Sequence, residues 1–240
     1  MNYFSKLSGW ACCALSIGAM ACQPACASIV MDGTRVIYQG DKNEVTISLT
    51  NKNPRPVLIQ SWIDTGNEKA TPDKISVPFV LTPPINRVDP NQGQTIRISY
   101  TGTPALPADR ESVYWLNVLE VPSKDKNSAD VHQKLNVVFR TRIKLFYRPE
   151  GLPGNSNEAP DELHWRMSGQ NVTVQNSSKY NVTIFDINYK NSGVSSTANG
   201  KMIAPGATQS FALKNTGNIE GLSFNTINDY GALVNHKAKS

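Results

Sequence analysis

Residues 135–147 read LNVVFRTRIKLFY, thirteen residues without glycine or proline. A typical β-strand has about five or six residues. One face of this strand would carry Leu135, Val137, Phe139, Thr141, Ile143, Leu145 and Tyr147. The stretch reads either as an ordinary sandwich strand with one face in the core, or as a strand that lies at an edge or extends beyond its neighbours. Because apolar edges invite pairing with other chains, an edge that is kept apolar predicts strand addition to a partner.

Short alternating runs separated by turn residues continue on both sides of this stretch and predict an all-β fold. Val45, Ile47 and Leu49, for example, alternate with polar residues before a turn at 51–54. The candidate strands before Pro149 are residues 34–38, 45–50, 57–63, 79–81, 96–100, 113–119 and 135–147. About seven short strands are expected of an immunoglobulin-like sandwich.

A second, smaller sandwich is predicted after residues 149–157, which are rich in proline, glycine and asparagine and read as a linker or a long first turn. Its strands are marked by Val172, Val174, Val182, Ile184, Ile187, Phe211, Leu213, Leu222 and Phe224. We predict an N-terminal domain over 28–149, a linker over 150–158 and a C-terminal domain over 159–240. No segment shows an apolar helical face, and the polar residues 236–240 are expected to be a disordered tail.

Residues 1–27 differ from the rest of the chain and read as a cleaved signal peptide. They contain one charged residue and an apolar stretch, and Ala25-Cys26-Ala27 fits a signal-peptidase site. The apolar run is shorter than the roughly 18 to 20 residues that span a bilayer, which disfavours a membrane anchor. A lipid-modified Cys22 or Cys26 fits its surroundings poorly. All four cysteines lie in this segment, so the mature chain would fold without disulfides.

Charge and site motifs exclude several function classes. The formal net charge of +5 falls by one to +4 when Lys6 leaves with the leader, a mild excess without the basic clusters of nucleic-acid binders. The three histidines lack metal-ligand spacing, and no GxSxG or phosphate-binding glycine motif occurs. Asp64 with Glu68, and Asp161 with Glu162, are interpreted as solvated loop charges. We therefore expect neither an enzyme nor a bound metal, cofactor or small-molecule substrate.

Five blocks of the sequence resemble the periplasmic pilus-chaperone family. They are Thr34-Arg35-Val36-Ile37-Tyr38, Thr82-Pro83-Pro84, Asp109-Arg110-Glu111-Ser112, Thr141-Arg142-Ile143-Lys144-Leu145-Phe146-Tyr147-Arg148-Pro149 and Ile227-Asn228-Asp229-Tyr230-Gly231. The resemblance covers essentially the whole mature chain. It implies two immunoglobulin-like β-sandwich domains set at an angle, with a cleft between them, in a periplasmic protein that folds, caps and delivers pilus (fimbrial) subunits by lending them a β-strand.

The resemblance also implies roles for particular residues. Arg35 and Lys144 would anchor the subunit's C-terminal carboxylate in the cleft through charge-assisted hydrogen bonds, which are roughly twice as strong as neutral ones. The donor strand would use Leu135, Val137, Phe139, Thr141 and Ile143. A structural ion-pair network between the domains would involve Glu111, Arg148 and Asp229.

The implied partners are pilus subunits and an outer-membrane usher. In the free protein, self-association or an ordered neighbouring loop would cover the apolar strand. The short segment 122–133 and the lack of cysteine after residue 27 resemble the short-loop branch of the family, which typically serves rod-like adhesive pili. Pro84 is a candidate for a cis peptide bond after Pro83. A pilus subunit or adhesin, and a glycan- or peptide-processing enzyme, are the alternatives; two complete domains argue against the first, and no motif supports the second.

Overall fold

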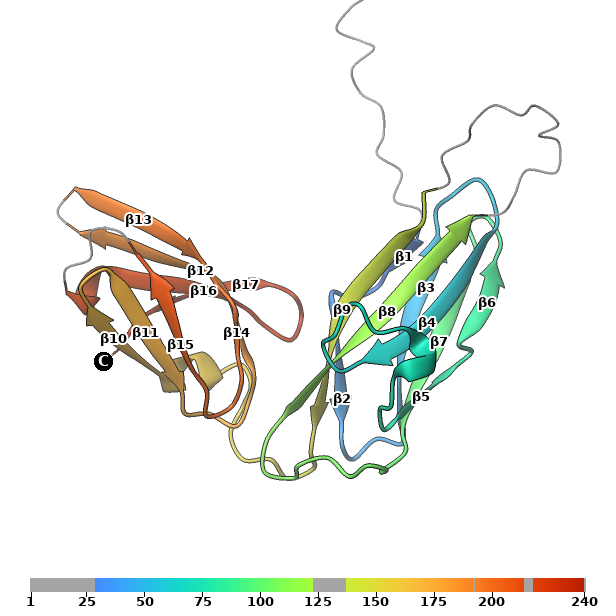
Figure 1. The fold of residues 1–240 in the computed structure, drawn as a ribbon, viewed down its shortest axis with the longest axis horizontal. Coiled ribbons are helices and arrows are strands. Elements are labelled where there is room, and N and C mark those ends of the chain that lie inside the picture. The colour runs from blue at the N-terminus through green and yellow to red at the C-terminus, as the bar shows by residue number, and fades with distance from the viewer. Residues whose placement is uncertain (1–28, 123–136, 192, 214–217, 240) are drawn as a thin grey trace, which may run out of the picture.

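Two β-sandwich lobes make up the protein (Figure 1). The computed structural model describes residues 29–122, 137–191, 193–213 and 218–239. Within these ranges the helical segments are the short 3-10 turns η1 (Pro72–Lys74), η2 (Ala159–Glu162) and η3 (Ile219–Gly221). None of them is long and apolar enough to cross a membrane. The predicted all-β class is confirmed, whereas the predicted signal peptide lies outside the described residues.

The N-terminal lobe pairs a four-stranded sheet of order β1-β3-β7-β5 with a five-stranded sheet of order β2-β9-β8-β4-β6. Its strands are β1 (Ile29–Met31), β2 (Arg35–Gln39), β3 (Glu44–Asn51), β4 (Val57–Asp64), β5 (Phe79–Thr82), β6 (Ile85–Val88), β7 (Gly93–Tyr100), β8 (Ser112–Pro122) and β9 (Phe139–Arg148). In the larger sheet β9 pairs antiparallel with β8 and parallel with β2. The sequence therefore located seven of these nine strands and missed β1 and β6.

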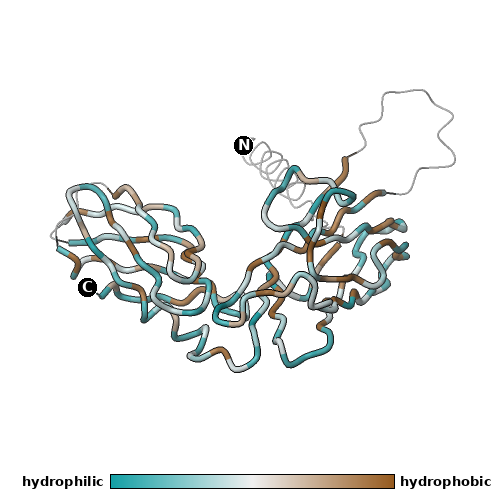
Figure 2. The backbone as a smooth tube through the Cα atoms, turned by 60° about the horizontal axis from the view of Figure 1, so that its bottom comes forward, coloured by the Kyte–Doolittle hydropathy of each residue, from teal (hydrophilic) through white to brown (hydrophobic). Residues whose placement is uncertain are grey.

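The core of this lobe follows the alternation seen in the sequence. Ile47 and Leu49 of β3, Ile96 and Ile98 of β7, and Leu145 of β9 are almost completely buried. Each buried side chain of this size contributes roughly 1.5 to 3 kcal/mol relative to exposure. The hydropathy-coloured trace shows the same apolar stretches along the strands of both lobes (Figure 2).

The C-terminal lobe is a smaller sandwich with sheets of order β10-β11-β15 and β13-β12-β16-β17, and β14 also pairs with β12. Its strands are β10 (Leu163–Ser168), β11 (Asn171–Asn176), β12 (Val182–Asn191), β13 (Val194–Asn199), β14 (Met202–Ile203), β15 (Thr208–Ala212), β16 (Leu222–Ile227) and β17 (Leu233–Lys237). Trp165 packs on Phe224 at the centre of this lobe, with 4.7 Å between ring centroids. The two lobes thus have separate cores.

The expectation of a disordered tail from residue 236 was wrong. His236 belongs to β17, which pairs with β16 in the register Phe224 opposite His236. The His236 ring stacks on Phe224 at 5.1 Å, and its Nε2 lies 2.9 Å from the Thr226 hydroxyl. Backbone pairing to β16 orders this polar segment without an apolar side-chain pattern of its own, which is why hydropathy alone missed it.

The cis peptide bond lies one residue earlier than expected. The bond between Thr82 and Pro83 is cis, and so is the bond between Thr103 and Pro104. The bond between Pro83 and Pro84 is not among the cis bonds of the described residues. Proline lowers the trans preference of whichever bond precedes it, so the two adjacent prolines were equivalent candidates in the sequence.

Candidate functional site: a cleft between the two lobes

Two basic side chains stand next to each other where the lobes meet. Arg35 is the first residue of β2 and lies opposite Lys144 of β9 in the parallel register. Arg35 Nη1 donates a 2.9 Å hydrogen bond to the carbonyl oxygen of Ile227, and Lys144 Nζ donates one of 3.1 Å to the hydroxyl of Thr183. Both acceptors belong to the C-terminal lobe, so the pair spans the boundary between the lobes.

Neither cation is neutralised by a direct ion pair within the described residues. Burial and the charge of Arg35 lower the pKa of Lys144 to about 8. Burial also lowers the pKa of Arg35, against the opposing influence of Asp229 and Glu111, and its Nε is buried without a hydrogen-bond partner there. Two partly buried like charges side by side are unfavourable unless an anion joins them, so the pair is suited to binding one.

The other arginines of this region already have carboxylate partners. Arg148 at the end of β9 lies 2.8 Å from Glu111 and 3.0 Å from Asp229. Glu111 also accepts a 2.9 Å hydrogen bond from the Asn181 backbone of the C-terminal lobe. The structure therefore brings Glu111, Arg148 and Asp229 together across the lobe boundary. Since the side chain of Glu111 is 2% exposed, that of Arg148 11% and that of Asp229 24%, this is a largely buried network rather than a set of separate surface charges.

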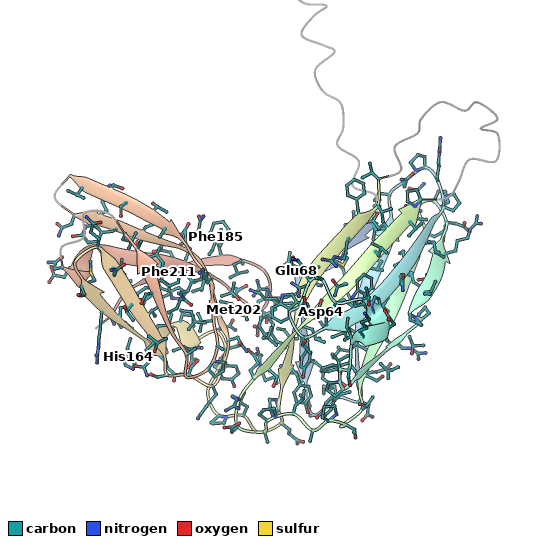
Figure 3. All side chains as sticks on the ribbon, viewed as in Figure 1. Asp64, Glu68, His164, Phe185, Met202 and Phe211 are labelled. Atoms are coloured by element: carbon teal, nitrogen blue, oxygen red, sulfur yellow. The ribbon has the colours of Figure 1, made fainter. Side chains whose placement is uncertain are left out.

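A cleft of about 410 Å³ opens beside the basic pair. Its lining residues come from both lobes and are Thr34, Arg35, Glu68, Trp115, Arg142, Ile143, Lys144, Thr183, Ile227 and Gly231. Figure 3 shows Asp64 and Glu68 on the side of the N-terminal lobe that faces the C-terminal lobe. The cleft is thus an open site lined by both charged and apolar side chains rather than an enclosed pocket.

The first half of β9 has a vacant edge. It pairs with β8 from Phe139 to Tyr147, but β2 covers its other side only from Lys144 onwards. No strand of the described residues pairs with that side over 139–143. The expected edge strand is therefore present, although it begins at Phe139, and Leu135 lies outside the described residues.

Side chains along this strand differ in accessibility. Val137 is 44% exposed and Phe139 is 59% exposed, whereas Ile143 is 9% exposed and packs in the core of the N-terminal lobe. Thr141 between them is half-buried. Of the five candidate donor residues, Val137 and Phe139 are thus the described apolar ones that a partner can reach. The side chain of Ile143 is already buried in the core of its own lobe.

The interpretation of Asp64 as a solvated loop charge was wrong. Its side chain is 2% exposed and accepts two hydrogen bonds from Arg142, of 2.6 and 3.1 Å, and one of 2.7 Å from Asn117. Glu68 does remain 69% exposed, 3.5 Å from Arg142. Asp64 ends an unbroken apolar-rich strand, β4, and that position was the signal that it is buried.

Comparison with known proteins finds a family match for each lobe. Residues 28–153 match the model of the N-terminal domain of the PapD pili and flagellar-assembly chaperones, and residues 158–238 match that of the PapD C-terminal domain. The chain is 44% identical over 221 residues to the probable fimbrial chaperone YadV of Escherichia coli K12, covering 89% of this chain and 90% of YadV. The crystal structure of YadV superposes with a TM-score of 0.74 at 41% identity, covering 88% of this chain and 98% of that one.

Two further relatives are similar over most of their length. The chain is 42% identical over 216 residues to the chaperone protein FimB/FhaD of Bordetella pertussis, covering 88% of each. It shares its fold, at a TM-score of 0.73 and 23% identity, with the SafB chaperone solved in complex with the SafA pilin of Salmonella enterica, covering 90% of this chain and 98% of that one.

Proposed function

The chain belongs to the PapD-type pili-assembly chaperone family, and from this we propose that it holds pilus subunits by donor-strand complementation, with the subunit's C-terminal carboxylate between Arg35 and Lys144. Chaperoning of pilus subunits is the function of this family, and it is not a catalytic one. The SafB neighbour is solved with a pilin, which supports the same class of client. The anchor and the donor strand are the parts that require tests.

One observation carries the proposal: the vacant edge of β9 ends where β2 begins. A subunit strand added beside 139–143 would continue the line of β2, and its end would abut Arg35, which faces Lys144. A chain whose last residue lies beside Ile143 and whose preceding residues lie towards Phe139 runs parallel to β9, as β2 does. Arg35 and Lys144 would then lie at the end of the client chain, where its terminal carboxylate neutralises their positive charge.

Apolar side chains at the start of β9 supply the remaining contact. Val137 and Phe139 point into solvent in the free protein, and Leu135 is predicted to extend the same face. Burial of each contributes roughly 1.5 to 3 kcal/mol, from which the costs of association must be subtracted. Backbone pairing adds affinity that depends little on the client's sequence, which suits a chaperone that serves several subunits.

We expect Phe139→Ser to weaken subunit binding about tenfold or more while leaving the free energy of unfolding nearly unchanged, because this side chain is buried only in the complex. Co-purification and titration with a pilus subunit measure the first effect, and urea unfolding measures the second. Phe185→Ser is the matched control, since Phe185 is 53% exposed on β12 of the C-terminal lobe. Equal losses in the two variants would contradict the donor-strand assignment.

The same variant tests self-association of the free protein. If free molecules cover one another's apolar β9 edge, sedimentation of the wild type at rising concentration will show oligomers, and Phe139→Ser will shift them towards monomer. Monomers at all concentrations would rule that idea out. We further propose export to the periplasm after cleavage before Ser28 and delivery to an outer-membrane usher. The mass of the protein released from the periplasm tests the cleavage site.

Subunit binding should weaken as the pH rises from 7 to 9. The pKa of Lys144 is about 8 in the free protein. Above this pH Lys144 is mostly neutral, so binding of the client's carboxylate must be coupled to proton uptake by Lys144. Affinity should then fall by up to about tenfold per pH unit. Lys144→Arg keeps its charge throughout, and its affinity should stay level over this range. An equal decline in both proteins would remove Lys144 from the anchor.

In contrast to subunit affinity, the free energy of unfolding of the free protein should increase as the pH rises. Between about pH 8 and 10.5 the unfolded chain holds a proton on Lys144 that the folded chain has lost. The free energy of unfolding therefore gains a contribution from Lys144 that rises with pH in this window. Urea unfolding of the wild type and Lys144→Arg at both ends of the window isolates that contribution.

A further inference from the structure

A second hollow lies between the two lobes, behind the wall of the cleft. This inter-lobe cavity has a volume of about 150 Å³ and is more enclosed than the cleft. Arg35, Thr183 and Ile227 line both spaces and therefore lie between them. Because Arg35 Nη1 donates its hydrogen bond to the Ile227 carbonyl oxygen, the lobes are joined at this wall. The cavity thus forms only while the two lobes keep their present orientation.

The lining of the inter-lobe cavity combines apolar and polar side chains. The apolar ones are Phe146 from the N-terminal lobe and Pro160, Val182 and Val234 from the C-terminal lobe. The polar ones include Thr226, whose hydroxyl lies 2.9 Å from His236 Nε2. A hydroxyl can accept two hydrogen bonds and donate one, so this contact leaves Thr226 able to bind a further polar group.

The charged groups of the lining differ in what they still require. Glu111 and Asp229 both line the cavity, and Arg148 already pairs with them at 2.8 and 3.0 Å. Arg35 Nε, in contrast, is buried without a hydrogen-bond partner among the described residues. A buried N–H group requires an acceptor, but an anion placed here would also meet the two carboxylates. The lining therefore favours an uncharged acceptor oxygen.

The size of the cavity indicates what could carry that oxygen. One water molecule occupies about 30 Å³ of liquid volume, whereas an apolar cavity of about 150 Å³ in another protein holds a benzene ring. A ring of this size can pack on Phe146 and Val182. A primary amide attached to the ring has an acceptor oxygen for Arg35 Nε and donor N–H groups for the Thr226 hydroxyl. Ring and amide together match both parts of the lining.

We propose that the inter-lobe cavity is a binding site for a small uncharged aromatic amide, and that the bound amide holds the two lobes in the orientation seen here. A ligand that contacts both lobes binds this orientation better than any other, so it shifts the population towards it. The site is separate from the client's donor strand and from its carboxylate, and its test needs neither.

The test uses the purified protein with benzamide as the probe. Titration followed by amide NMR should give saturable shifts at Val182, Thr226 and Val234, with a dissociation constant of about 1 mM or lower, within reach of a ligand of this size. Toluene, which lacks the amide, and benzylamine, which is a cation, should bind at least about tenfold more weakly because they leave Arg35 Nε unpaired. Benzamide should also raise the melting temperature.

Filling the cavity gives a variant with a close control. Val234 lines the cavity and is 36% exposed, so Val234→Phe can place its ring in the same space and should abolish benzamide binding. Leu233→Phe is the matched control, because Leu233 is the preceding residue of β17, is 57% exposed and is not among the lining residues. Neighbouring strand residues point to opposite faces, and this control should keep the affinity of the wild type.

A second pair of variants distinguishes the cavity from the cleft. Arg35→Ala should weaken benzamide binding about tenfold or more, since it removes the donor of the proposed hydrogen bond. Lys144→Ala removes the other cation of the cleft, which is not among the lining residues of the cavity, and should bind benzamide as the wild type does. Arg148→Ala, which loses the ion pairs between the lobes, should bind it more weakly.

The outcomes that would overturn the proposal are specific. If titration gives no saturable shifts at the three positions, the cavity holds water only. Benzamide binding that survives Val234→Phe, or that falls equally in Arg35→Ala and Lys144→Ala, places the compound elsewhere. Toluene or benzylamine binding as tightly as benzamide would contradict the amide class, and unchanged affinity in Arg148→Ala would contradict the link to lobe orientation. Thermal unfolding of each free variant separates loss of the site from loss of the fold.

Discussion

Replacement of Arg35 and Lys144 together by alanine is expected to weaken subunit binding about a hundredfold or more. Each charge-assisted hydrogen bond to a carboxylate contributes about 1.5 to 3 kcal/mol, and the two side chains are the unneutralised cations of the cleft. A peptide with a free C-terminus should lose this affinity, whereas its amidated form should bind the wild type and the variant almost equally. Titration with both peptides measures the effect directly.

The stability of this double variant gives an independent check. The lowered pKa of Lys144 shows that its charge is disfavoured in the free protein, so its removal should leave the free energy of unfolding unchanged or raise it. A control that removes two exposed arginines, Arg87→Ala with Arg166→Ala, changes the net charge equally and should keep full affinity. If the control loses as much as the variant, general electrostatic attraction explains binding and the anchor does not exist.

Arg148→Ala is expected to lower the free energy of unfolding by about 3 to 5 kcal/mol, because it leaves a buried carboxylate without its cation. Glu111 is 2% exposed and depends on Arg148 for its charge partner, and Asp229 connects the same guanidinium to the C-terminal lobe. Thermal and urea unfolding report the loss. Small-angle scattering should also show a wider spread of lobe orientations, and subunit affinity should fall with it.

Arg110→Ala is the control for this prediction. Arg110 lies one residue from Glu111, but its pair with Asp109 spans 3.5 Å between side chains that are 52% and 67% exposed. Such a pair contributes about 0 to 1 kcal/mol. If Arg148→Ala proved as mild as Arg110→Ala, the three charged residues would not be holding the lobes together.

Strand positions were predictable where burial imposes a period of two. Val45, Ile47 and Leu49 alternate with polar residues because one face of β3 lies in the core. The alternation in β9 could be recognised in the sequence for the same reason. Edge strands such as β17 bury little of either face, so their sequence carries no such period. They form because a neighbour offers unpaired backbone groups, and that neighbour is known only once the sheet is assembled.

The residues of the candidate site also fall into some that were predicted from the sequence and some that were missed. Arg35 and Lys144 were found through the motifs of a resemblance, since nothing in an isolated arginine or lysine distinguishes an anchor from a surface charge. The pairing of Asp64 with Arg142 was missed because the partners are 78 positions apart and meet only across β8. A carboxylate at the end of an apolar strand is a signal of burial, but it does not name its partner.

The junction of β2 with the vacant edge of β9 makes the protein a molecular ruler. Lys144 lies five positions after Phe139, a distance of about 17 Å in an extended strand. A client whose C-terminus is fixed at Lys144 places a defined residue beside Phe139. The register of the client strand is therefore set by the number of residues counted back from its C-terminus. One extra C-terminal residue would change the parity of that count, and two would restore it. Length, as well as composition, therefore becomes a property that this cleft can recognise.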